Sequence, residues 1–171
     1  MPSPVQRTTA GSDHGHDRPR AEPWLGRRGL VTLLVGFWAV WFTVVFLTNC
    51  FDGLAHLGAV GDGWTFRSGN YAFLLEVMAV HDTPESIVAL VFAVGVGWEL
   101  VVAVAMWWTL AGYVRATASR RRLYLAFLPA IGFFAAFLVL TELFVAYDVA
   151  ATHVRLFVAT LLSAYVVDRW W

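Results

Sequence analysis

The sequence predicts an all-α membrane protein built around a bundle of four transmembrane helices. Of its 171 residues, 59% are hydrophobic and only 14% are charged, whereas soluble domains have roughly half and a quarter, respectively. The mean hydropathy is +0.64, and a soluble chain of this length has too small an interior to bury so much apolar surface. The apolar residues also gather into four runs, each close to the about 20 residues that cross the hydrocarbon core of a bilayer.

The first expected span covers residues 29–49 and follows a polar segment at residues 1–23. That segment is rich in Pro, Ser, Gly, Asp, His and Arg and shows no periodic pattern, so we expect a disordered tail on the cytoplasmic side. The apolar run exceeds the about 7 to 15 residues of a signal-peptide core, and no small-residue cleavage site follows it. We therefore expect a retained helix and assign residues 24–171 to the transmembrane domain.

Three further spans are expected at residues 85–114, 123–147 and 149–167, which leaves residues 50–83 as a long loop. Part of this loop has apolar residues at helical spacing, which predicts a short helix on the membrane surface or across the end of the bundle. The residues on this stripe are Tyr71, Leu74, Leu75, Met78 and Ala79.

The stretch HDTPESI predicts where the second span begins. Thr83 has the residue type and position of an N-cap, with Pro84 at the first helical position. Asp82 and Glu85 have the spacing of a capping box, and both acids suit the positive end of the helix dipole. This pattern has a structural explanation and needs no functional one.

The arginines predict an orientation. They cluster before the first span and in the turn at residues 115–122, whereas the loop at residues 50–83 contains only Arg67 among several acidic residues. Positively charged loops stay in the cytoplasm, so we expect both termini inside (N-in/C-in) and the long loop outside. The expected location is the inner (cytoplasmic) membrane, where the chain is a multi-pass protein.

Charge and cysteine content exclude several classes of protein. The formal net charge is zero, with 12 basic and 12 acidic residues, and the basic residues lie in short clusters beside apolar runs, unlike the basic surface of a nucleic-acid-binding protein. All of them are Arg, which suggests a GC-rich prokaryotic genome. Cys50 is the only cysteine, which excludes an intrachain disulfide and a CxxC motif.

Glu99 is the only charged residue between Glu85 and Arg115, and it lies in the middle of the second expected span. Gly95 and Ala103 share its helix face, and small residues mark close helix contacts in membranes. A charged carboxyl at the bilayer centre costs about 2.5 to 3.5 kcal/mol on insertion scales, so we expect Glu99 to point into the bundle. A hydrogen bond that fixes packing, a proton or ion relay, and contact with a ligand all stay open.

Glu142 and Arg155 form a second candidate pair. They lie on either side of Asp148, where the last two spans are expected to turn, so two antiparallel helices would bring them to a similar depth. An Arg–Glu pair there is expected to form a charge-assisted hydrogen bond. Such a pair would pin the two helices together or, alternatively, help to bind an anionic or quinone-like ligand.

Three histidines, His56, His81 and His153, all fall near the outer face under this topology. Imidazoles beside carboxylates bind transition metals, which makes a metal or haem site one hypothesis. No pair of them has the HxxxH spacing of a helical metal site, so hydrogen bonding at the interface is the alternative.

No nucleophile elbow, P-loop or GxGxxG motif occurs, so we predict no catalytic residue and no cofactor. The expected function is a non-catalytic accessory or scaffolding component of a membrane assembly, surrounded by the lipid bilayer and forming a homo-oligomer or part of a larger complex. One alternative is a small transporter or proton-conducting protein that uses Glu99. The other is a metal- or haem-binding redox protein that uses the outer histidines.

Three stretches, TNCFDG, NYAFLLEVMAVHDTP and GWELVVAVAMWWTLAG, together resemble a bacterial family of small integral membrane proteins, domain of unknown function 2165. The resemblance covers mainly residues 40–115. It implies the size and four spans of that family but no activity. The matching positions are Asn49, Asp52, Asn70, Phe73, Trp98 and Glu99, with VHDT at residues 80–83.

Overall fold

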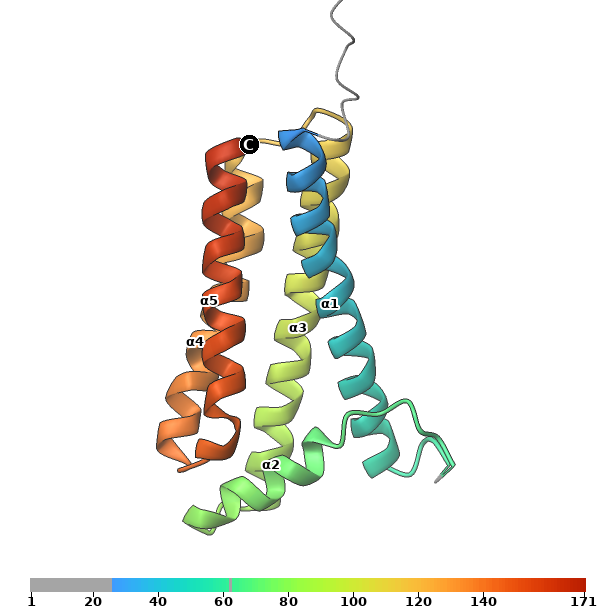
Figure 1. Ribbon diagram of the computed structural model, residues 1–171. Helices are drawn as coiled ribbons and strands as arrows, with labels where there is room; N and C mark the ends of the chain where they lie inside the picture. The colour runs from blue at the N-terminus through green and yellow to red at the C-terminus, as the bar shows by residue number, and fades with distance from the viewer. Residues whose placement is uncertain (1–25, 62) are drawn as a thin grey trace, which may run out of the picture.

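The computed structural model describes residues 26–61 and 63–171, so the predicted tail at residues 1–23 lies outside the described residues. Within those two ranges, all regular secondary structure is helical and no β-strand occurs. In chain order, the elements are α1 (Arg27–His56), α2 (Asn70–Met78), the short 3-10 helix η1 (Ala79–His81), α3 (Glu85–Val114), α4 (Arg120–Leu143) and α5 (Tyr147–Trp170) (Figure 1).

Four of these helices, α1, α3, α4 and α5, are long and apolar enough to cross a membrane. They contain 30, 30, 24 and 24 residues, and at about 1.5 Å per residue each is longer than the about 30 Å of the hydrocarbon core. The predicted all-helical class and the predicted four apolar spans are therefore confirmed.

The ends of the helices agree with the prediction at α3 and differ at α1 and α4, whereas α5 is two residues longer at its start and three at its end than the predicted residues 149–167. Helix α1 continues past Asn49 to His56, because the first residue with a left-handed backbone is Gly58, at φ 70°. Helix α4 ends at Leu143, earlier than expected, because Val145 takes a left-handed conformation with φ 56°. The extension of α1 matters for the site, since it adds about two helical turns where a loop was expected.

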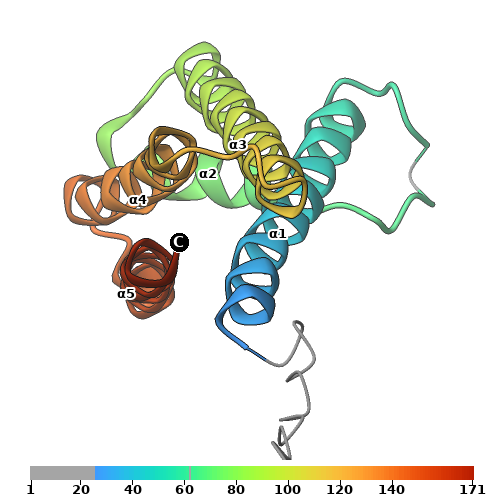
Figure 2. The same ribbon diagram turned by 90° about the horizontal axis from the view of Figure 1, so that it is seen from above.

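The helices pack mainly as two pairs, α1 with α3 and α4 with α5, and α3 also packs against α4 (Figures 1 and 2). The start of α1, the turn between α3 and α4 and the end of α5 lie at one end of the bundle (Figure 1). Helix α2 crosses the opposite end, where it contacts α1 and α3.

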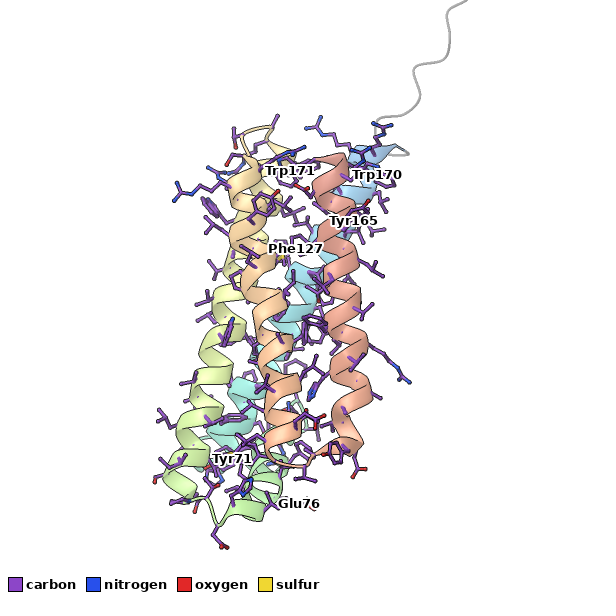
Figure 3. The ribbon with its side chains drawn as sticks, turned by 90° about the vertical axis from the view of Figure 1, so that its left-hand side faces the viewer. Tyr71, Glu76, Phe127, Tyr165, Trp170 and Trp171 are labelled. Atoms are coloured by element: carbon purple, nitrogen blue, oxygen red, sulfur yellow. The ribbon has the colours of Figure 1, made fainter. Side chains whose placement is uncertain are left out.

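The predicted short helix in the long loop is present as α2. Tyr71 and Met78 of its apolar stripe are buried, Leu74 and Leu75 are half-buried, and only Ala79 is exposed. Tyr71 and Glu76 lie at this end of the bundle, and Tyr165, Trp170 and Trp171 lie toward the other end (Figure 3). Aromatic side chains near both ends of the bundle suit the two membrane–water interfaces.

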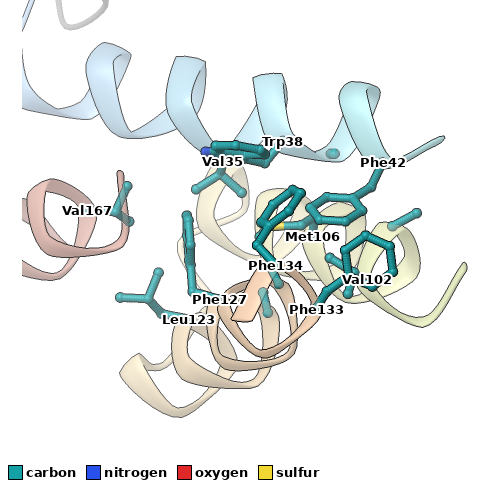
Figure 4. Close-up of a cluster of buried hydrophobic side chains, with 14 of the residues drawn as sticks. Val35, Trp38, Phe42, Val102, Met106, Leu123, Phe127, Phe133, Phe134 and Val167 are labelled. Atoms are coloured by element: carbon teal, nitrogen blue, oxygen red, sulfur yellow. The ribbon is translucent and has the colours of Figure 1, made fainter. Parts of the chain in front are cut away.

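An aromatic cluster fills the centre of the bundle and sets the rotation of each helix about its axis. Phe42 of α1 lies 5.8 Å from Phe134 and 5.9 Å from Phe133, measured between ring centroids. Since lipid tails are as apolar as these side chains, close packing holds the helices together here more than exclusion from water does. Labelled in Figure 4 are Val35, Trp38, Phe42, Val102, Met106, Leu123, Phe127, Phe133, Phe134 and Val167.

Trp98 joins α3 to α4 beside a proline in the middle of α4. Its indole Nε1 donates a hydrogen bond to the carbonyl of Pro129 at 3.1 Å, and its ring packs against Gly132, where an added Cβ would lie 3.5 Å from it. A proline inside a helix removes one backbone hydrogen bond, here the one to the carbonyl of Leu125, so the bond from Trp98 to Pro129 is an additional contact between the two helices. The residue next to Glu99 is thus fixed against α4.

Candidate functional site

A polar cluster is buried where α1, α2 and α3 meet. Asn49 is 5% exposed, Asp52 7% and Glu99 3%, although all three carry strongly polar groups. Polar groups buried at this depth are stable only when they are hydrogen-bonded. We refer to these three residues, together with Ser68 and Asn70, as the polar cluster.

A chain of hydrogen bonds runs from α3 through α1 to α2. The amide Nδ2 of Asn49 donates to Oε1 of Glu99 at 2.7 Å. The amide Nδ2 of Asn70 in turn donates to Oδ1 of Asn49 at 2.8 Å. Asn49 therefore uses both its donor and its acceptor to connect the other two elements.

Asp52 caps α2 from a different helix. Its Oδ2 accepts a hydrogen bond from the backbone N–H of Tyr71 at 2.8 Å and one from Oγ of Ser68 at 3.3 Å. The first N–H groups of a helix have no partner within the helix, and a negative charge near them is favourable. Gly69, the N-cap of α2, has no side chain for this task, so Asp52 supplies the cap.

The continued helix explains why these residues meet. Asn49 and Asp52 are three positions apart, so they share a face only because α1 stays helical past Asn49. In an ordinary loop the two side chains would have no fixed relation. The sequence alone pointed to Asn49, Asp52 and Asn70 only through the family resemblance, and it did not single out Ser68.

Glu99 has one carboxyl oxygen that is free of partners. Oε1 accepts the bond from Asn49, but Oε2 is buried and has no hydrogen-bond partner among the described residues. This oxygen can hold a proton or accept a hydrogen bond from a bound molecule.

Of the two small residues expected at close helix contacts, Ala103 is 4% exposed, whereas Gly95 has no described atom within 4 Å of its Cβ position. The predicted contact at Gly95 is therefore wrong.

Tyr71 and His56 stack beside the polar cluster with ring centroids 4.0 Å apart. Burial raises the pKa of Tyr71, and the charge of nearby Glu85 raises that pKa further. The phenol group therefore stays neutral near pH 7.

The predicted pair of Glu142 and Arg155 does not form. Both side chains are exposed, and no ion pair joins them in the part of the chain that the structure describes. The reason is the rotation of α5, since His153 packs on Phe137 with ring centroids 5.0 Å apart. Arg155 lies two positions later, about 200° around the helix, and so faces away from α4.

The three histidines have three different settings. Nε2 of His56 lies 3.3 Å from Oε1 of Glu85. Nε2 of His81 donates to the carbonyl of Leu143 at 2.8 Å, and Nδ1 of His153 lies 3.1 Å from Oγ1 of Thr141. No group of three His, Cys, Asp or Glu side chains that could hold a metal ion occurs within residues 26–61 and 63–171. The histidines therefore do not meet in a shared metal site there. His56 lies beside Glu85 of α3, whereas His81 and His153 bond to separate residues near the end of α4.

The start of α3 agrees with the prediction, but the capping residues do not act as expected. Pro84 is the N-cap, and no side-chain hydrogen bond caps this described helix end. The predicted N-cap, Thr83, therefore lies one residue before the actual one. Asp82 takes a left-handed backbone with φ 49° and ends η1, so the predicted capping box of Asp82 and Glu85 does not form. Glu85 lies in the first helical turn and pairs with His56.

No protein-family model, curated protein or solved structure matches the chain. The resemblance to the family of small integral membrane proteins therefore stays a prediction. Asn49, Asp52, Asn70 and Glu99, four positions of that resemblance, come together in the polar cluster.

Proposed function

We propose that this protein is a non-catalytic component of a membrane assembly, an accessory or scaffolding subunit that binds its partner through α5. The observation that carries the proposal is Arg155, an exposed arginine within a membrane-spanning helix. It lies about 12 Å along α5 from the first residue, at about 1.5 Å per residue. Ionisable side chains in such segments almost always face a bundle interior, a cavity or a partner charge.

The low burial of α5 supports the same proposal. Only 11% of its span is buried, against 22% to 33% for the other three spans, and its buried residues are Thr160 and Val167. A broad face of α5, including Arg155, is thus free to pack against another protein. A second copy of this chain or a different subunit with a carboxylate at the same depth fits this face.

The remaining buried polar groups favour a structural use. The bond between Asn49 and Glu99 holds α1 to α3, and Asp52 holds α2 to α1. Both interactions serve packing within the chain and need no substrate.

We also propose that the bundle lies in a prokaryotic inner membrane with both chain termini on the cytoplasmic side. Arg28 lies in the first turn of α1, Arg115 is the C-cap of α3, and Arg121 lies in the first turn of α4. These helix ends lie at the end of the bundle where α5 also ends (Figure 1). Positively charged segments next to spans are retained in the cytoplasm, which supports this orientation.

The test of the assembly function uses the tagged protein in a mild-detergent extract of its native membrane, separated by native electrophoresis. We expect the wild-type protein to migrate in a complex, Arg155→Leu to dissociate from it, and Arg121→Leu to stay bound. Arg121 is an exposed arginine in the first turn of α4, so its replacement controls for loss of charge. A wild-type monomer, or an unchanged complex in Arg155→Leu, would show that Arg155 simply extends to the membrane surface.

A second candidate function is proton conduction through Glu99, and the free Oε2 of this residue favours it. The test is proton flux into liposomes that contain the purified protein. Glu99→Gln should abolish the flux while Glu142→Gln, at the exposed end of α4, leaves it intact. Flux no higher than in empty liposomes excludes this function.

A further inference from the structure

A groove of about 500 Å³ lies between α1 and α3, next to the polar cluster. It runs along α3 from Glu85 to Val96, a distance of about 16 Å at 1.5 Å per residue. Small residues create the space, because Gly53, Ala89 and Ala93 line it. Phe92 lies against Gly53, where an added Cβ would be 3.1 Å from its ring.

The walls and the two ends of the groove differ in polarity. Its walls are mainly apolar, whereas His56 and Glu85 stand at the end nearer α2. These two side chains are 3.3 Å apart and are 39% and 64% exposed. Asn49 stands at the inner end, but its amide is already bonded to Glu99 and Asn70.

A second, smaller hollow of about 150 Å³ adjoins the polar end of the groove. It shares His56 and Tyr71 with the groove and adds Arg67. Glu85 thus lines the groove, Arg67 lines the smaller hollow together with Asp52, and the imidazole of His56 lines both.

We propose that the groove binds one acyl chain of an amine-bearing zwitterionic phospholipid, with the ammonium at Glu85 and the phosphate toward His56 and Arg67. Ligand sites are commonly mostly apolar hollows of about 300 to 1,000 Å³ with a few polar groups, and they occur between helices of bundles. Ala93 is exposed, so the groove opens sideways, to where acyl chains lie in a bilayer.

The size of the groove favours a lipid chain over a protein helix. A helix with its side chains is at least about 10 Å across, so a 16 Å length of it would fill more than about 1,200 Å³. The groove holds about 500 Å³, which suits a single hydrocarbon chain.

Cys50 provides a native reporter for the occupant, because it lines the groove and is the only cysteine in the chain. The experiment measures the rate at which N-ethylmaleimide labels Cys50 in delipidated protein, followed by mass spectrometry. The labelling rate is compared among separate micelle samples that contain phosphatidylethanolamine, phosphatidylglycerol, a free fatty acid of the same chain length, or no added lipid. With phosphatidylethanolamine at ten times its dissociation constant, we expect labelling to slow about tenfold.

The other lipids test the headgroup assignment. Phosphatidylglycerol and the fatty acid should protect Cys50 several-fold less, because neither offers an ammonium to Glu85. Equal protection by all three overturns the proposed head site, and an unchanged labelling rate with phosphatidylethanolamine overturns the lipid site itself.

Two variants separate the site from general effects on folding. Ala93→Phe should fill the groove, so the labelling rate no longer depends on lipid, whereas Ala151→Phe, at an exposed position on α5, should keep the wild-type response. Glu85→Gln changes an exposed side chain that contacts His56 and should reduce protection by phosphatidylethanolamine alone. If Ala93→Phe does not fold, the labelling rate of Glu85→Gln tests the proposal. Full protection of Cys50 by phosphatidylethanolamine in either variant contradicts it.

Discussion

At the residue scale, the polar side chains within the spans have two kinds of surroundings. Glu99 and Asn49 are buried and bonded to each other at 2.7 Å, so their polarity is used to hold two helices together. Arg155 is exposed, and no described residue forms an ion pair with it. The first arrangement stabilises the single chain, and the second is the one that we interpret as a contact for another protein.

The bond between Asn49 and Glu99 predicts a measurable loss of stability. Asn49→Leu removes the donor to the buried carboxyl of Glu99 and the acceptor for the exposed Asn70, and leaving the buried carboxyl unpaired costs about 1 to 3 kcal/mol. Interhelical hydrogen bonds in membranes average about 0.6 kcal/mol and reach about 1.7, so we expect the free energy of unfolding to fall by about 1 to 2 kcal/mol. Unfolding in mixed micelles with increasing dodecyl sulfate gives this value.

The control for that prediction is a double-mutant cycle with Glu99→Leu. If Asn49 and Glu99 stabilise each other, the double variant is more stable than the sum of the two single losses implies. Strict additivity would mean that the stabilisation comes from packing alone.

Asp52 predicts a local effect at the start of α2. Asp52→Ala removes the charged acceptor of the Tyr71 N–H, and hydrogen bonds to charged groups contribute about 1.5 to 3 kcal/mol. Since 1.4 kcal/mol is a factor of ten, exchange of the Tyr71 amide hydrogen should speed up about ten- to a hundredfold. Hydrogen-exchange mass spectrometry measures it, and Glu76→Ala at an exposed position of the same helix should leave the rate unchanged.

At the element scale, single residues with left-handed backbones decide where the helices stop. Gly58 ends the α1 region at φ 70°, and Val145 lies just after the end of α4 at φ 56°. Glycine adopts this conformation freely, whereas it is strained for a β-branched residue. The short turn between α4 and α5 is therefore formed at an energetic cost.

Relieving that strain should stabilise the protein. We expect Val145→Gly to raise the free energy of unfolding by about 1 kcal/mol, because the left-handed region costs an ordinary residue about 1 to 2 kcal/mol. Val149→Gly is the control within α5 and should lower it by about 0.3 kcal/mol, the difference in helix propensity between valine and glycine. Chemical unfolding in micelles measures both, and a loss of stability in Val145→Gly would contradict the assigned strain.

At the scale of the whole molecule, the exterior of the spans is largely apolar and most of the described arginines lie at one end, Arg67 and Arg155 being the exceptions. Large exposed side chains such as Leu33, Val101 and Leu128 cover the spans, which suits lipid as the surrounding solvent. Arg28, Arg115 and Arg121 lie at the end away from α2. This asymmetry makes the orientation testable.

We expect the end of the bundle that α2 crosses to lie outside the cytoplasm. In a Cys50→Ser background, Ala59→Cys in the long loop should react with a membrane-impermeant maleimide on intact cells. Ser119→Cys, in the turn between α3 and α4, should react only after the membrane is permeabilised. The reverse pattern would refute the N-in/C-in orientation.

The sequence by itself determined the helices. The four apolar runs and the stripe on α2 were predictable, and α3 begins and ends where its flanking polar residues predicted. Hydropathy, helical periodicity and flanking charges are properties of neighbouring residues, so they can be read along the chain. The burial of Glu99 followed in the same way from the cost of exposing a carboxyl group to lipid.

Only the tertiary structure decided which side chains meet. The aromatic cluster around Phe42, Phe133 and Phe134 packs α1 against α4. The contact between Phe137 and His153 orients α5, so that His153 faces α4 and Arg155 faces away from it. Packing between helices also brings Asn49 to Glu99, and the continuation of α1 brings Asp52 to α2. Rotation, tilt and the exact end of a helix depend on contacts between distant segments, which local patterns do not contain.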